Sequence, residues 1–278
     1  MNTFTLPITQ ASVQQQVELA LRPRVMHRYL THLHEPLRGE KHNSAACHVL
    51  DAKYEPDARC SILYQLGERL VIGELQWPKT ELAMLDARAE MPPHQDSLEM
   101  QVYPFEHDPA LPGLTTVLDG QKMAQILAAS LRTAVGALPE GTRILRCQVT
   151  PLRYRLGKRC TLRFTLRLRD GATGALSTRT FYGKLYHNAA KAQAVYQEMQ
   201  MLSAAPALRT GRVEVAQAVA FEPTLPLVLQ APVSGVPLDL LLSQPKRAAR
   251  SANPRTAAQI RLAAAGLAAL HQVEGNSK

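Results

Sequence analysis

The stretch from Cys147 to Tyr186 reads CQVTPLRYRLGKRCTLRFTLRLRDGATGALSTRTFYGKLY. It contains three runs in which apolar and polar residues alternate, and this two-residue period is typical of β-strands with one buried face. Turns are predicted at residues 156–158 (Leu-Gly-Lys) and 170–174, because each contains a glycine that can adopt positive φ. The clearest run places Leu162, Phe164, Leu166 and Leu168 on one face and Arg163, Thr165, Arg167 and Arg169 on the other. The stretch therefore predicts a three-stranded antiparallel sheet.

A single lysine, Lys184, stands among the apolar residues of the third run. A lysine in a half-buried strand needs a partner, because an unpaired buried ammonium group is costly. A helix is predicted to follow at about 189–203 with Asn188 as its N-cap, and its Glu198 is predicted to face partly toward the sheet. A strand lysine followed by a helix glutamate is the arrangement that holds nucleotide phosphates in a kinase small lobe.

The order of these pieces resembles the small lobe of the aminoglycoside phosphotransferase-like branch of the protein-kinase fold. The resemblance covers about half of the chain, from residue 147 to residue 271. It implies that the chain is the N-terminal part of an ATP-dependent phosphotransferase that acts on a small molecule. The segments that carry it are YRLGKRC at 154–160, YGKLY at 182–186, the Glu198 helix, LVLQAPVSGVPLDLLL at 227–242 and LAALH at 267–271.

The resemblance also implies the site residues. Lys184 would contact phosphate and Glu198 would pair with it, while Gly157 would belong to a phosphate-binding turn. The Ala231 carbonyl and the Val233 N–H would bind the adenine edge in the family's hinge. The alternatives are an edge lysine with its amine in water, a surface glutamate and an ordinary strand-to-helix turn. Glu214 and Glu222 are competing partners for the lysine.

No HGD, HRD or DFG sequence occurs in the chain, and only QVEGNSK follows His271. No catalytic or metal-binding aspartate can therefore be assigned, and enzymatic activity of this chain is left open. We expect the chain to be cut or truncated before the catalytic loop, with ATP and Mg²⁺ as cofactors of the full-length protein. A nucleotide and a small-molecule phosphate acceptor are the implied partners. The alternative is a non-catalytic, kinase-like binding or regulatory module.

An internal repeat is indicated by two pairs of cysteines, Cys47/Cys60 and Cys147/Cys160, which lie 100 residues apart. Without a gap, CHVLDAKYEPDARCSILYQL and CQVTPLRYRLGKRCTLRFTL match at six positions, and Tyr54 aligns with Tyr154. In the next strand VIGEL aligns with FYGKL, so that Glu74 stands where the second copy has Lys184. Because a glutamate does not attract phosphate, the first copy is not expected to hold a nucleotide in this way.

The predicted fold class is α+β, with two tandem kinase-small-lobe-like units, the first degenerate, followed by the start of a helical large lobe. The predicted domains are 1–139, 140–242 and 243–278. Helices are predicted at 12–34 with an interruption at Pro23, and at 79–90, 120–138 and 255–271. Residues 101–118 and 218–229 each predict two strands around a proline-marked turn.

The composition favours a cytoplasmic protein. The 278 residues carry a net charge of +9, no apolar run is long enough to span a membrane, and four cysteines suit free thiols. The histidines and cysteines lack metal-ligand spacing, so a metal site is not predicted. The excess of positive charge suits a phosphate-bearing ligand. Nucleic-acid binding ranks last, because only 5% of the residues are aromatic, and the arginine-rich strands are interpreted as a solvated sheet face.

Overall fold

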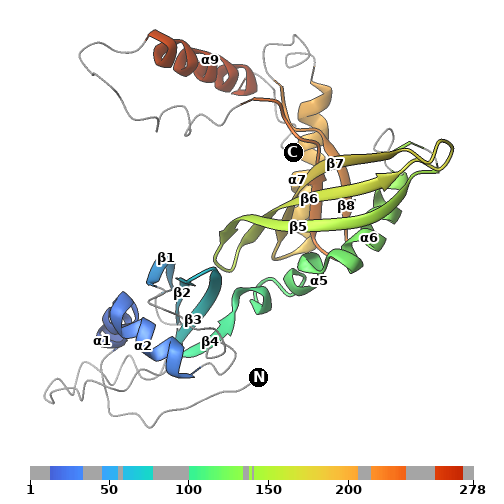
Figure 1. Ribbon diagram of the computed structural model, residues 1–278. Helices are drawn as coiled ribbons and strands as arrows, with labels where there is room; N and C mark the ends of the chain where they lie inside the picture. The colour runs from blue at the N-terminus through green and yellow to red at the C-terminus, as the bar shows by residue number, and fades with distance from the viewer. Residues whose placement is uncertain are drawn as a thin grey trace, which may run out of the picture. The chain divides into compact units, whose positions relative to one another are not determined.

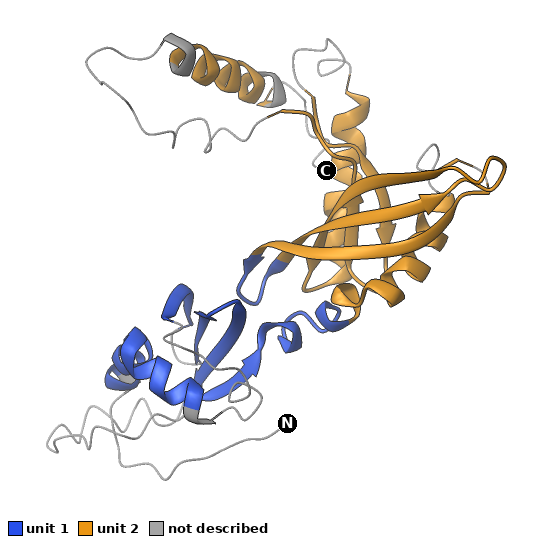
Figure 2. Ribbon diagram, in the orientation of Figure 1, with its two compact units in different colours: residues 1–115, 154–159 blue, residues 116–153, 160–278 orange. Residues whose placement is uncertain are grey.

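The computed structural model describes residues 13–33, 46–55, 59–77, 100–133, 138–139, 141–205, 214–235 and 254–271. The chain forms two compact units, and two antiparallel sheets with helices make it an α+β protein. Unit 1 contains residues 1–115 and 154–159, and unit 2 contains residues 116–153 and 160–278 (Figure 2). This division lies before the boundary predicted at residue 139, because the helix that follows residue 119 belongs to unit 2.

Unit 1 consists of a four-stranded sheet with two helices before it. The strands pair in the order β1-β2-β3-β4, and every neighbouring pair is antiparallel (Figure 1). Pro23 separates the helices, as the sequence predicts. The elements are α1 (Val13–Ala20), α2 (Pro23–Leu33), β1 (Cys47–Glu55), β2 (Arg59–Leu66), β3 (Arg69–Gln76), β4 (Gln101–Pro104) and the 3₁₀-helix η1 (Phe105–His107).

The core of unit 1 lies between α1, α2 and one face of the sheet. The ring of Tyr64 is fully buried there, and its hydroxyl donates a 2.8 Å hydrogen bond to the Ala20 carbonyl at the end of α1. Because α1 and α2 precede the sheet, its cover does not come from the helix predicted at 79–90, which lies outside the described residues. The buried cluster includes Ala20, Met26, Leu30, Cys47, Cys60, Ile62, Tyr64, Leu66, Val71, Leu75, Trp77 and Met100.

Unit 2 contains a five-stranded sheet with the order β5-β6-β7-β9-β8. Its first three strands follow one another along the chain, and β9 pairs with β7 before β8 closes the edge. The elements are α6 (Gly120–Thr133), β5 (Arg143–Arg155), β6 (Arg159–Arg169), β7 (Leu176–Tyr186), α7 (Ala189–Ala204), β8 (Ala218–Glu222), β9 (Leu227–Gln230) and α9 (Pro254–His271).

The two faces of this sheet are covered by different helices. Helix α7 begins at Asn188, whose side chain accepts a 2.7 Å hydrogen bond from the Lys191 N–H as predicted, and packs on Tyr186 and Val228. Helix α6 runs from β5, where Gly120 lies against the Cys147 carbonyl, to β8 at the opposite edge. Since α7 occupies one face, α6 crosses the other.

One predicted strand is wrong. Residues 101–118 contain β4, but the second strand predicted there is replaced by η1 and by the helix α5 (Leu114–Leu118). In contrast, residues 218–229 form the two strands β8 and β9, as predicted. The first sheet therefore ends with β4, which pairs with β3. In the second sheet β7 pairs with β9, the second of the two strands β8 and β9.

The first three strands of the two sheets have matching positions. Strand β1 ends at Glu55 and β2 begins at Arg59, while β5 ends at Arg155 and β6 begins at Arg159. Both three-strand segments have the same strand order, which agrees with the 100-residue offset in the sequence. All four cysteines are buried free thiols, and burial raises the pKa of Cys160 to about 12. None of the described helices could cross a membrane.

Candidate functional site

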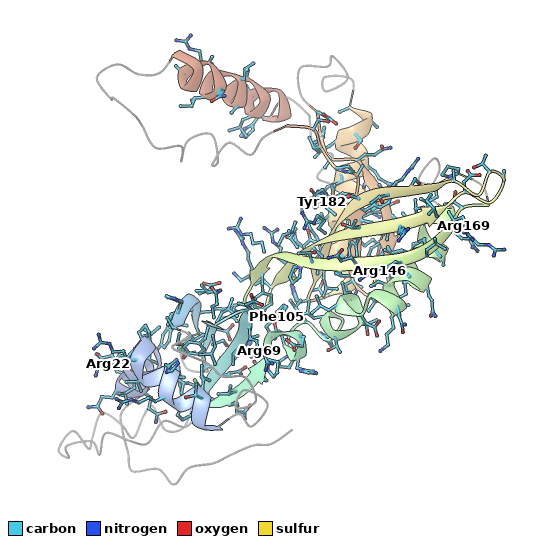
Figure 3. All side chains as sticks on the ribbon, viewed as in Figure 1. Arg22, Arg69, Phe105, Arg146, Arg169 and Tyr182 are labelled. Carbon is cyan, nitrogen blue, oxygen red and sulfur yellow. The ribbon has the colours of Figure 1, made fainter. Side chains whose placement is uncertain are left out.

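The side of the sheet on which Lys184 lies follows from Gly183. A Cβ on Gly183 would come within 2.5 Å of the Phe164 ring, so these two residues share a face. Successive residues of a strand point to opposite faces, so Lys184 lies on the other face. Lys184 is directly opposite Val228, which belongs to the cluster under α7. The sequence-predicted lysine is therefore half-buried on the α7 side of the sheet, and Figure 3 marks Tyr182 on the same strand.

The predicted orientation of Glu198 is wrong. Its side chain is exposed, and within the described residues no ion pair joins it to Lys184. Helix α7 instead turns Ala192, Val195 and Met199 toward the sheet. The sequence could not fix this face, because α7 carries apolar residues around most of its circumference and its periodicity is weak.

The segment after β9 leaves two backbone groups available. The Ala231 N–H donates a 2.9 Å hydrogen bond to the Gln217 carbonyl. In the part of the chain that the structure describes, the Ala231 carbonyl and the Val233 N–H have no hydrogen-bond partner. Residues 232–235 are exposed, and Gly235 adopts a φ of 129°, which glycine tolerates without strain. The two backbone groups named from the sequence thus lack a hydrogen-bond partner among the described residues.

Gln230, at the end of β9, is a candidate that sequence reasoning missed. It is directly opposite Tyr182 and therefore lies on the same face as Lys184. Its Oε1 atom is buried and accepts no hydrogen bond from any described residue. A buried acceptor without a donor is unfavourable, so a ligand donor or a water molecule would stabilise it. The signal in the sequence is a polar residue that directly follows the apolar run Leu227–Leu229.

The turn that contains Gly157 is packed rather than open. Gly157 has the expected positive φ of 61°, but Leu156 beside it is buried, and a Cβ on Gly157 would lie 3.7 Å from the Ala110 Cβ. The Tyr154 hydroxyl donates a hydrogen bond to the buried Asp108 carboxylate, and burial raises the Tyr154 pKa, as does this bond. These residues belong to unit 1, so the structure does not bring Gly157 and Lys184 together in one unit.

Glu74, at the position that corresponds to Lys184, is enclosed by polar partners. Its side chain is 5% exposed and accepts hydrogen bonds of 2.8 Å from both the Tyr103 hydroxyl and Gln76. Arg59 lies 3.4 Å away and also pairs with Glu55. Burial raises the Tyr103 pKa, and the bond to Glu74 raises it further. The Glu74 carboxylate is therefore part of a closed structural network.

The described residues contain no group of three or more acidic, histidine or cysteine side chains that could hold a metal ion. No family model, curated protein or solved structure matches this chain. What the site does must therefore be inferred from its own geometry.

Proposed function

We propose that unit 2 contains the nucleotide-binding small lobe of an ATP-dependent phosphotransferase that acts on a small molecule, similar to the aminoglycoside phosphotransferase-like family. The observation that carries the proposal is the position of Lys184 on β7 beside β9, whose end leaves the Ala231 carbonyl and the Val233 N–H available. A cation for phosphate and a backbone donor–acceptor pair for a base edge thus come from two paired strands.

The described residues fit a nucleotide in part. Lys184 would bind phosphate oxygens, while the Ala231 and Val233 backbone groups would bind the base edge and position it. The Gln230 Oε1 atom supports this assignment, because an exocyclic amino group of a base would supply the donor that it lacks. The described residues do not fit Mg²⁺ equally well, since Glu198 is exposed and no cluster of carboxylates lies near Lys184. The metal ligands and the catalytic base would belong to the family's large lobe.

Binding of a fluorescent ATP analogue to this chain tests the proposal. Lys184→Met removes a charge-assisted contact worth about 1.5–3 kcal/mol, so the affinity should fall about tenfold or more. Lys122→Met is the matched control, because Lys122 is an exposed lysine of α6 in the same unit. Equal affinity of the Lys184→Met variant and the unchanged chain would refute the phosphate contact.

The hinge contact has its own test. Val233→Pro removes the backbone N–H and should weaken binding of the analogue, whereas Val233→Ala keeps the N–H and should not. The Val233 side chain is 44% exposed, so neither change disturbs a core. If both variants bind as the unchanged chain does, the segment is an ordinary turn.

A second candidate is a non-catalytic binding or regulatory module. The exposed Glu198 favours it, because a kinase small lobe in its active arrangement pairs that glutamate with the lysine. This candidate predicts nucleotide binding without transfer of phosphate in the full-length protein. An assay of phosphate transfer with the full-length protein separates the two candidates.

A further inference from the structure

We infer that the exposed arginines of β5 and β6, on the face of the unit 2 sheet that α7 partly covers, bind single-stranded nucleic acid. Four arginines define this arginine face, and Tyr182 and Lys184 lie on it as well. The inference goes beyond the proposed function, because it assigns a polymeric partner to residues that the nucleotide proposal does not use. The four arginines are Arg153, Arg163, Arg167 and Arg169.

The placement of the arginines on one face follows from the strand geometry. Burial along β6 alternates without interruption, so Arg163, Arg167 and Arg169 lie opposite the buried face of Phe164. Since Gly183 shares the Phe164 face, Tyr182 lies on the arginine side. The turn between β5 and β6 begins at Arg155 and ends at Arg159. This position of the turn places Arg153 of β5 on the same face as the arginines of β6.

Within the part of the chain that the structure describes, these arginines have no partners of opposite charge. All four are exposed, and no described carboxylate forms an ion pair with any of them. Residues 143–186 contain eleven lysines and arginines but a single acidic residue, Asp170. The Asp170 Oδ1 atom is occupied by its own turn, where it accepts hydrogen bonds from the Ala172 and Thr173 N–H groups. Like charges on adjacent strands repel one another, so an anionic ligand would relieve this repulsion.

A nucleic acid fits the face better than a small anion. The positive side chains extend along two strands, which suits several phosphates in a row. Tyr182 is half-buried on the same face and offers an aromatic surface, while arginine side chains both bind phosphate and stack on bases. An aromatic side chain on this face favours an unpaired strand over a duplex, because unpaired bases are free to stack on side chains.

Fluorescence anisotropy of the chain with a labelled single-stranded 12-mer of uridine tests this inference. We expect binding that weakens as salt increases, with a slope of log K against log salt of about −3 for four phosphate contacts. Arg167→Glu/Arg169→Glu should reduce the affinity at least tenfold and about halve the slope. The control Arg22→Glu/Arg24→Glu changes the net charge equally on exposed residues of unit 1 and should have a small effect.

Further variants and ligands identify the partner. Arg167→Lys/Arg169→Lys should retain most of the affinity, which excludes misfolding as the cause of the loss. Tyr182→Ala should weaken binding of the 12-mer but not of inorganic polyphosphate. Equal affinity for the 12-mer and for polyphosphate, or no effect of Arg167→Glu/Arg169→Glu, would overturn the inference. Because Arg167 and Arg169 are not nucleotide ligands, that variant should still bind the ATP analogue, so either proposal can fail without the other.

Discussion

The first and second sheets place the same four positions on one face, and they use that face in opposite ways. In the first sheet Ser61, Leu63, Ile72 and Glu74 are all buried, with exposures of 8%, 3%, 1% and 5%. In the second sheet the matching residues Thr161, Arg163, Tyr182 and Lys184 are half-buried or exposed, and two are cationic. The first face is buried at all four positions, whereas the second, which α7 partly covers, keeps its cationic side chains half-buried or exposed.

The opposite faces of the two sheets are more alike. An aromatic ring, Tyr64 or Phe164, lies against a glycine, Gly73 or Gly183, where a side chain would collide with the ring. Each ring is fully buried. The shared arrangement packs a ring against a glycine in both sheets, so the two sheets agree in this core contact and differ on the opposite face.

The largest effect is expected from Phe164→Ala, which should reduce the stability of unit 2 by about 3–5 kcal/mol because it leaves a cavity in a packed core. Hydrogen exchange, resolved to peptides from β5–β7, measures this loss. Peptides from β1–β3 should change far less, since Phe164 belongs to unit 2. Equal loss of protection in both sheets would mean that the two units unfold together.

Glu74→Ala should reduce the stability of unit 1 by about 2–4 kcal/mol, because the Tyr103 hydroxyl and Arg59 lose a buried acceptor. Glu74→Gln keeps an oxygen acceptor in place and should cost less. Thermal unfolding of both variants provides the measurement. If Glu74→Ala is as stable as the unchanged chain, the network contributes nothing.

Gly183→Ala should reduce stability by about 1–3 kcal/mol, because the added methyl group meets the Phe164 ring at 2.5 Å and Leu227 at 3.0 Å. Gly73→Ala should cost less, since its nearest neighbour is the flexible end of Met100, which can move aside. Urea unfolding of the two variants under the same conditions compares them. The reverse ranking would show that Tyr64, 2.9 Å from the added atom, limits the first sheet.

The smallest effect is expected from Tyr64→Phe, which should reduce stability by about 1 kcal/mol. The substitution puts at position 64 the same ring that the second sheet has at Phe164, without a hydroxyl. The Ala20 carbonyl then loses the 2.8 Å hydrogen bond that the Tyr64 hydroxyl donates. Exchange of the α1 and β2 amides is the appropriate measurement. An unchanged exchange rate in α1 would mean that water replaces the hydroxyl.

The sequence correctly predicted most of the described helices and every described strand, but it also predicted a second strand within 101–118 that does not form. Alternation in β6 predicted which of its residues are buried. The interruption at Pro23 and the N-cap at Asn188 were also predicted where the structure shows them. Residues 114–118 were misassigned, because a five-residue segment with three apolar residues fits a short helix as well as a strand. The helix predicted at 79–90 lies outside the described residues, and the domain predicted at 243–278 is described only at residues 254–271.

The candidate site was predicted less completely than the fold. Lys184, Ala231 and Val233 could be named, since each has a recognisable place at a strand or its end. The exposure of Glu198 and the unpaired oxygen of Gln230 could not, because both depend on how α7 and β9 pack. The packed turn at Gly157 depends in the same way on contacts with residues far away in sequence.

The sequence alone determined which residues share a face of each sheet, because alternation in a strand is a local property of the backbone. It also determined the 100-residue offset between the copies and the excess of positive charge in the second. Only the tertiary structure decided which faces are covered. Burial depends on segments that are distant in the chain, so equivalent strand positions hold a buried Glu74 in the first sheet and a half-buried Lys184 beside α7 in the second.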